Sequence, residues 1–254
     1  MVIFDEIRQL ALAVGLDDVG CAPAEYLEDD ARFMETWLTI ALRAHNSPSG
    51  AQSTIHYPQS TKLHYLAKNC DKRYDPRMLV PGTQTVLVGV LTFEHSGHDY
   101  HRTMKSKLYA LEAALKNKYG EDIVNPDYQH IFCDSAPVLE RRWAQKAGLG
   151  FIGKNHAFIH PQLGSLIHLG ELFLAVSLSA KRSYSETVLQ RSGLSAEGDP
   201  TAQRSACDAC TKCIDACPRK VLGVEPWDVT RCIAYETNHC LICQNCCPYN
   251  EKRE

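Results

Sequence analysis

The chain has 254 residues, of which 44% are hydrophobic and 22% are charged, and its formal net charge is −3. This length is sufficient for two domains and for a sizeable core that needs no cross-links. The charge balance excludes a global positive field that would attract nucleic acid, so any RNA contact has to come from local basic clusters.

Residues 1–15 form an amphipathic pattern with two acids, which is unlike the basic and apolar regions of a signal peptide. No apolar run approaches the ~18–20 residues that a membrane span needs. We therefore expect a cytoplasmic protein that makes no membrane contact. Disulfides are disfavoured in a reducing cytosol, so clustered cysteines point to metal ligands.

Hydrophobic periodicity predicts most of the secondary structure in the first part of the chain. In chain order, the predicted elements are a helix over 1–15, a short strand over 17–23, helices over 29–44 and 60–69, a strand over 83–93, a helix over 100–118, a strand over 128–134, a helix over 137–148 and strand material over 164–178. The helix over 100–118 places Leu108, Leu111 and Leu115 on one face. Pro137 stands at a plausible first helical position, and Gly148 at the helix end.

The alternation of strands and helices predicts an α/β or α+β domain over residues 1–180. Residues 181–206 are polar and predict a linker or surface loop. Residues 207–254 contain nine cysteines and few apolar residues, so bound metal would have to serve as the core of this small domain.

The cysteine spacing in the tail indicates iron–sulfur chemistry. The run "CDACTKCIDACP" is C-x2-C-x2-C-x3-C-P, the bacterial ferredoxin spacing, in which the fourth cysteine ligates a second cluster. Later cysteines bring the number of well-spaced thiols to eight, which is what two 4Fe–4S clusters require. A pair of zinc sites is the weaker alternative, because zinc sites usually pair two knuckles across a longer loop.

We assign four cysteines to each cluster. The first cluster takes Cys207, Cys210, Cys213 and Cys247, and the second takes Cys217, Cys232, Cys240 and Cys243. Cys246 is an alternative to Cys247, although Pro248 directly after Cys247 favours the latter. The remaining cysteines are isolated and are expected to be small buried residues: Cys21, Cys70 and Cys133.

Several motifs together resemble the epoxyqueuosine reductases. These are "KRYDPRMLVPG" (72–82), "HDYH" (98–101), "DSAPVLERRWAQKAGLGFIGKN" (134–155) and "GSLIHLGELFL" (164–174). With the cysteine tail, the resemblance covers most of the chain. It implies a cobalamin-binding α/β (α+β) domain followed by a small bacterial-ferredoxin-like domain with two 4Fe–4S clusters. It also implies an oxidoreductase that reduces epoxyqueuosine to queuosine in tRNA, with electrons from an external donor.

The resemblance also implies roles for single residues. Asp134 matches the proposed proton donor, and Arg73, Phe158 and Leu169 match positions that line or contact cobalamin. An acid beside apolar residues and the corrin could stay protonated until the epoxide oxygen leaves. From the residues alone, an N-cap before Ser-Ala-Pro is favoured for Asp134, which is compatible with a catalytic role, and a solvated surface position is favoured for Arg73.

Weaker assignments fall on neighbours of these motifs. Lys154, Asn155 and the stretch 99–101 lie in the same motifs, and His156 and His160 lie beside the expected corrin site. For His45, His56, His64 and His130 an ordinary surface or core position is expected.

The resemblance departs at two points that concern tRNA. Most members carry a longer basic segment between the matches to Cys232 and Cys240, where this chain has only "IAYETNH". Many members also continue into a C-terminal helical-repeat domain, so we expect a short member with less tRNA-binding surface. Two alternatives follow: a cobalamin-dependent reductase of a small molecule, and an electron-transfer protein with no substrate of its own.

Overall fold

The computed structural model describes residues 2–33, 69–97, 99–178, 207, 209–223, 231–237 and 240–251. The predicted linker over 181–206 and most of the predicted helices over 29–44 and 60–69 lie outside these residues. The part of the first of these helices that is described, residues 28–33, is helical.

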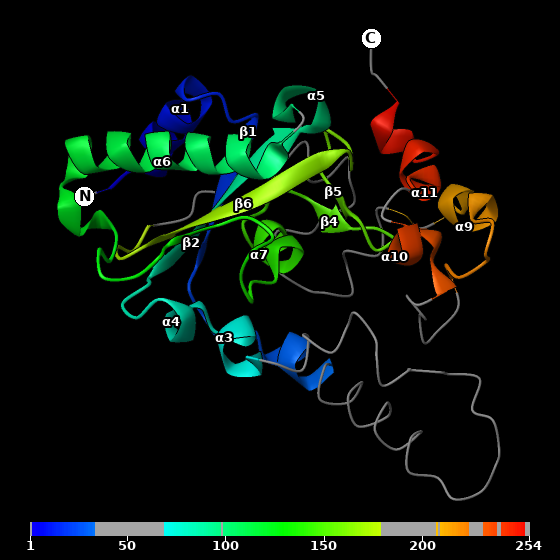
Figure 1. The fold of residues 1–254 in the computed structure, drawn as a ribbon, viewed down its shortest axis with the longest axis horizontal. Coiled ribbons are helices and arrows are strands. Elements are labelled where there is room, and N and C mark those ends of the chain that lie inside the picture. The colour runs from blue at the N-terminus through cyan, green and yellow to red at the C-terminus, as the bar shows by residue number, and fades with distance from the viewer. Residues whose placement is uncertain are drawn as a thin grey trace, which may run out of the picture.

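A four-stranded sheet forms the centre of the molecule (Figure 1). Its strands, in spatial order, are β1 (Asp18–Pro23), β2 (Thr85–Thr92), β6 (Ile167–Leu174) and β3 (Ile131–Phe132). Every neighbouring pair is antiparallel. The predicted mixture of helices and strands is confirmed. Because every pair of neighbouring strands is antiparallel, the domain belongs to the α+β class rather than to the α/β class, which is built on a parallel sheet.

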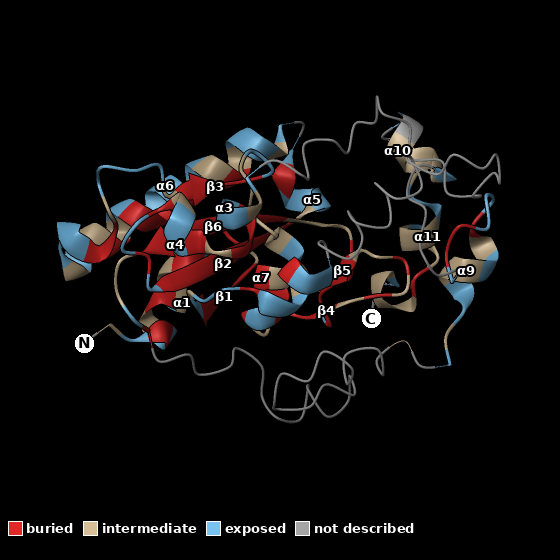
Figure 2. Ribbon diagram, turned by 90° about the horizontal axis from the view of Figure 1, so that it is seen from below, coloured by how far each residue is buried: buried red, intermediate tan, exposed pale blue. Residues whose placement is uncertain are grey.

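Helices cover both faces of this sheet. On one face lie α1 (Phe4–Ala13) and α6 (Tyr100–Tyr119), and the other face carries α7 (Glu140–Lys146) (Figure 1). The leucines predicted on one side of α6 are fully buried against the sheet. In α1 the buried face is Phe4, Ile7 and Ala11, whereas Ile3 precedes the helix and is exposed. Figure 2 shows that the most buried elements are the central strands.

Two local predictions were wrong. The helix expected from Pro137 begins only at Glu140, so Pro137 lies in the preceding loop and not at the first helical position. The strand expected over 128–134 is reduced to Ile131–Phe132 because only these two residues pair with β6. Gly148 does follow the helix end, with φ at +75°, a conformation that glycine adopts without strain.

Short elements complete the chain. They are α3 (Cys70–Tyr74), α4 (Pro76–Leu79), α5 (Phe93–Ser96), the 3-10 turn η2 (Glu121–Ile123), the hairpin β4 (Phe151–Ile152) and β5 (Phe158–Ile159), and, in the tail, α9 (Lys212–Ala216), α10 (Ile233–Thr237), α11 (Ile242–Asn245) and the 3-10 turn η5 (Pro248–Asn250). The tail helices gather beside the β4–β5 hairpin at one end of the sheet (Figure 1). Among the helices described here, none is both long and apolar enough to cross a membrane.

Candidate active site

A cavity of about 540 Å³ lies between the sheet and the cysteine-bearing tail. Its size falls within the range of roughly 300–1,000 Å³ that is typical of small-molecule and cofactor sites. Asp134, Phe158 and Leu169 line it from the sheet side. The tail lines it with Cys217, Cys232, Cys240 and Cys243. Apolar strand residues and a set of thiols therefore face one space.

A second cavity of about 310 Å³ lies further into the tail. The cysteines that line it are Cys207, Cys210, Cys213 and Cys247. Asn155 borders both cavities, so the two are neighbours. The structure thus gathers the eight cysteines into two groups of four, each at its own cavity.

The thiol of Cys246 is directed elsewhere. Its Sγ donates a hydrogen bond to the carbonyl oxygen of Cys243 at 3.6 Å, and Cys246 does not line either cavity. At Cys217, burial raises the pKa of the thiol, but backbone N–H groups of residues 219–222 outweigh it and lower the pKa below its ordinary value. Donors of this kind stabilise a thiolate, which is the form that binds metal.

Asp134 follows β3 in a left-handed conformation with φ at +49°, which is unusual for a residue other than glycine. The Tyr100 hydroxyl donates to its Oδ2 at 2.8 Å, and its own N–H donates to Oε1 of Glu140 at 2.6 Å. The N-cap of α7 is Leu139, so the N-cap alternative for Asp134 is wrong. The side chain is exposed at the cavity and not buried as expected, whereas Glu171 behind the cavity wall is fully buried.

Four aromatic rings are stacked beside Asp134, and one of them, His168, lines the cavity. Phe93 and His168 have ring centroids 4.4 Å apart, His168 and Tyr100 3.8 Å, and Tyr100 and His101 4.0 Å. Burial, followed by the hydrogen bond to Asp134, raises the pKa of Tyr100 well above its ordinary value, so its hydroxyl remains a donor. Burial also lowers the pKa of His168, which favours its neutral form. The stacking of His168 and His101 on Tyr100 restrains the Tyr100 ring, whose hydroxyl donates a hydrogen bond to Asp134.

The other residues that the sequence motifs single out differ in whether they line the cavity beside Asp134. Arg73 is buried in α3, so it is not a solvated surface group, but it does not line the cavity. Lys154 Nζ lies 3.2 Å from the carbonyl oxygen of Cys210, and Asn155 Nδ2 lies 3.2 Å from that of Cys243. These two residues therefore connect the sheet domain to the tail. His156 lines the cavity.

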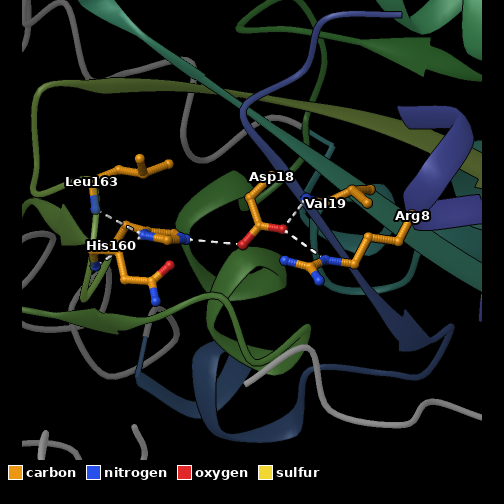
Figure 3. Close-up of polar contacts among 6 residues, drawn as sticks. Arg8, Asp18, Val19, His160 and Leu163 are labelled. Atoms are coloured by element: carbon orange, nitrogen blue, oxygen red, sulfur yellow. Dashed lines mark hydrogen bonds and ion pairs between the residues drawn. The ribbon is translucent and has the colours of Figure 1, made fainter. Parts of the chain in front are cut away.

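His160 lines neither cavity, and Figure 3 shows its polar contacts instead. Its Nδ1 accepts from the backbone N–H groups of Gln162 and Leu163, and its Nε2 lies 3.2 Å from Oδ2 of Asp18. Arg8 Nε lies 3.3 Å from the other carboxylate oxygen. Both His160 and Asp18 are buried, so the pair ties β1 to the loop after β5. His130 likewise pairs with Glu112, at 3.1 Å.

Two amide side chains of the tail, those of Asn250 and Gln244, also attach it to the sheet domain. Asn250 accepts from the N–H of Ser165 at 2.6 Å and donates to its Oγ at 2.9 Å, and Gln244 donates to the Ser165 carbonyl at 2.8 Å. Gly164, with φ at +76°, passes so close that an added Cβ would lie 1.9 Å from the Asn250 side chain. Phe151 packs edge-on against Tyr249, with ring centroids 5.3 Å apart.

The donor sets fit the groups that the sequence implies. Four thiols at one cavity and four at the next match the ligand number of a cubane cluster. The cavity beside Asp134 combines an apolar wall of Phe158, Ile167 and Leu169 with many polar and charged side chains, which suits an organic cofactor that has both apolar and polar parts. A reducible cofactor there would stand between an acid and an electron source.

Glu140 and Glu171 are members of this site that the sequence analysis did not single out. Glu140 lines the cavity and accepts from Asp134, and Glu171 is fully buried on β6 behind it. The available signal was the position of Glu171 as the only acid in the apolar strand "IHLGELFL". Tyr100 lies in the 98–101 motif, but the sequence does not indicate its partner. Its hydrogen bond to Asp134 joins residues 34 positions apart and forms only in the folded chain.

Comparisons with known proteins agree with this geometry. No protein-family model matches the chain. An epoxyqueuosine reductase of Leadbetterella byssophila is 30% identical over 96% of this chain and 79% of its own. The solved epoxyqueuosine reductase of Streptococcus thermophilus superposes with a TM-score of 0.71 at 21% identity, covering 100% of this chain and 68% of that one.

A second solved structure is an epoxyqueuosine reductase with an epoxyqueuosine-modified tRNA-Tyr stem loop. It has a TM-score of 0.68 at 21% identity and covers 98% of this chain and 65% of its own. These structural likenesses establish the shared fold, and the identity to the curated relative establishes the family. The chain therefore belongs to the epoxyqueuosine reductase family of oxidoreductases.

Proposed function

We propose that this protein reduces epoxyqueuosine to queuosine in tRNA, with cobalamin in the cavity beside Asp134 and two 4Fe–4S clusters in the tail. The observation that carries the proposal is the single cavity that Asp134 shares with Cys217, Cys232, Cys240 and Cys243. An acid and a set of metal-binding thiols on opposite walls of one space suit a reduction coupled to protonation. The family membership supplies the substrate.

In this proposal, residues 1–180 form the cobalamin-binding domain, 181–206 a linker and 207–254 the ferredoxin-like domain. The first cluster is held by Cys207, Cys210, Cys213 and Cys247, and the second by Cys217, Cys232, Cys240 and Cys243. The orientation of Cys246 toward a carbonyl supports Cys247 as the ligand. An external one-electron donor supplies the electrons.

Reduced cobalamin supplies a strong nucleophile and electron donor that no side chain can provide. Phe158 and Leu169 are buried and form an apolar part of the cavity wall against which the cofactor would pack. Asp134 holds the proton that the departing oxygen requires, and Tyr100 fixes its Oδ2. A left-handed backbone aims this carboxyl into the cavity. Arg73 is assigned to cobalamin only on the family motif, because it lies outside the cavity wall.

The experiment is an anaerobic assay of the reconstituted protein on an epoxyqueuosine-modified tRNA stem loop, with nucleosides analysed by mass spectrometry. We expect conversion to queuosine that requires added cobalamin and a chemical reductant. Binding of cobalamin without conversion would contradict the proposed substrate and would favour the reduction of a small molecule. Conversion without cobalamin would contradict the proposed cofactor.

A further inference from the structure

Helix α6 carries cations in two groups that differ in their partners. At its C-terminal end, Lys116 Nζ lies 2.7 Å and Lys118 Nζ 2.9 Å from a glutamate carboxylate oxygen. Near its N-terminal end, Arg102 and Lys105 form no ion pair with any acid among the described residues. The first group is neutralised within the fold, whereas the charge of the second group is available to a partner.

The helix itself gains nothing from cations at this end. The N-terminus of a helix carries a partial positive charge, so acids stabilise the first turn and cations do not. The first turn of α6 contains no acid, and Asp99 caps the helix by accepting from the backbone N–H of Arg102 at 3.0 Å. Because the helix end is already capped, the free cations of Arg102 and Lys105 have no local structural function.

Arg102 and Lys105 form a stripe along α6 together with Tyr109, and we call these three residues the α6 stripe. Their spacing of i, i+3 and i+7 places them along one face, which the buried leucines of the helix do not share. Arg102 is exposed, Lys105 is partly buried and Tyr109 is 54% exposed. At a rise of 1.5 Å per residue, the stripe is about 10 Å long.

The α6 stripe begins beside the candidate active site. A ring nitrogen of His101, the residue before Arg102, lies within 4.8 Å of a carboxylate oxygen of Asp134. Burial raises the pKa of the Cys133 thiol well above its ordinary value, and the charge of Lys105 opposes this, so the ammonium group is near that thiol. From there α6 runs along the sheet, away from the tail helices (Figure 1). A long substrate that reaches Asp134 can therefore follow the stripe outward.

The donors of the stripe suit a phosphodiester backbone. Arginine, lysine and tyrosine side chains all commonly donate to phosphate oxygens of nucleic acids. The substrate of the proposed function is one nucleoside within an RNA chain, so a phosphodiester continues from it on each side. With a net charge of −3, the protein has no general attraction for RNA, and the affinity has to come from local cations. An acidic electron-donor protein fits less well, because the thiols that would receive its electrons lie in the tail.

We propose that the α6 stripe binds the phosphodiester backbone of the tRNA beside the epoxyqueuosine nucleotide. Arg102 binds a phosphate near the cavity, and Lys105 and Tyr109 bind the backbone farther along the anticodon stem loop. Contacts to phosphate orient the RNA without reading its sequence. The inference rests on the function proposed above, because that function brings tRNA to this cavity.

RNA binding tests the stripe without turnover. The probe is a fluorescently labelled, unmodified tRNA-Tyr anticodon stem loop, and anisotropy gives its Kd for the anaerobically reconstituted protein at several salt concentrations. We expect the double variant Arg102→Gln, Lys105→Gln to raise Kd by on the order of 10-fold and to reduce the salt slope by roughly 1.4–1.8, because two phosphate contacts are lost. An unrelated RNA hairpin of equal length should lose the same factor in affinity.

The double variant Lys116→Gln, Lys118→Gln is the matched control, because it removes the same charge from the ion-paired end of the same helix. We expect this control to keep the wild-type Kd and salt slope. Far-UV circular dichroism and iron content of both double variants should equal those of wild type. Equal weakening in both variants would show a general effect of net charge and would overturn the stripe.

Turnover with a chemical reductant separates this inference from the proposed function. We expect the stripe variant to raise KM for the epoxyqueuosine-modified stem loop by the same factor as Kd and to keep kcat, because contacts remote from the reacting atoms bind ground state and transition state equally. Wild-type Kd and KM in this variant would overturn the stripe and leave the proposed function standing.

Two other outcomes are distinct. If the wild-type protein binds the stem loop through the stripe but does not convert it, the proposed function is contradicted and the stripe stands. If the stripe variant loses only the turnover that an electron-donor protein drives, with RNA binding unchanged, the stripe is a docking site for that donor and the proposal is overturned.

Discussion

Asp134 is held at the cavity by three features: its left-handed backbone, the Tyr100 hydroxyl and the carboxyl oxygen of Glu140. We expect Asp134→Asn to lower kcat by roughly 10²–10⁴-fold, because the amide accepts the same Tyr100 bond but has no proton to give. Tyr100→Phe keeps the acid and loses only its support, so a smaller loss is expected. Both variants are to be compared by single-turnover kinetics at equal iron and cobalamin content. Equal losses in both would argue that Tyr100, rather than Asp134, is the donor.

The buried Glu171 also has a consequence for stability. Its folded pKa lies above the unfolded value, so the folded state binds more protons, and the free energy of unfolding falls as pH rises from the unfolded pKa toward the folded one. Glu171→Gln removes this dependence. We expect the variant to gain stability over wild type as pH rises from about 5 to 8, by about 1–3 kcal/mol. Anaerobic urea unfolding of both proteins at several pH values measures this difference in the free energy of unfolding. If the stability gain of Glu171→Gln became smaller as pH rises, the raised pKa of Glu171 would be contradicted.

At the scale of elements, the β4–β5 hairpin and the loop after it connect the sheet to the tail. Gly164 has no room for a Cβ beside Asn250, and the Asn250 amide satisfies Ser165 on both sides. We expect Asn250→Ala to displace the tail and to lower donor-driven kcat by on the order of 10²-fold, since displacements of about 1 Å have such effects. Iron content should remain unchanged.

Asn245→Ala is the matched control for Asn250→Ala, because Asn245 lies on α11 with an exposed side chain. Donor-driven turnover in this control should equal that of wild type. If both variants are equally active, the amide of Asn250 does not hold the tail in its working position.

A second connection is the buried pair of Asp18 and His160. Burial raises the pKa of Asp18, but the His160 and Val19 hydrogen bonds outweigh it and lower the pKa below its ordinary value. The stabilisation is therefore present above the unfolded pKa of the carboxyl and is lost as pH falls through the folded one. We expect Asp18→Asn to cost about 1–3 kcal/mol at neutral pH and less in acid. Urea unfolding at neutral and acid pH measures the loss of stability in Asp18→Asn. Asp127→Asn is the control, because Asp127 is exposed and its substitution should leave the free energy of unfolding unchanged.

At the scale of the whole molecule, regular periodicity made the fold predictable. The leucines of α6 and the β-branched run of β2 indicated their elements because each repeats along a buried face. Cysteine spacing likewise indicated two groups of four. The helix expected from Pro137 begins late because the backbone of Leu139 is not helical, and the contact of Glu140 with the N–H of Asp134, six positions earlier, is not encoded in local propensity. The link from Tyr100 to Asp134 spans 34 positions and arises only from packing.

The central claim is that the tail holds two iron–sulfur clusters beside a cobalamin bound at Asp134. The most direct measurement is electron paramagnetic resonance of the anaerobically reconstituted protein with added cobalamin, before and after partial reduction. We expect a cob(II)alamin signal without a nitrogen ligand and, on reduction, signals of 4Fe–4S clusters in the same sample. Zinc in place of iron in the tail, or a cobalamin signal identical to that of the free cofactor, would contradict it.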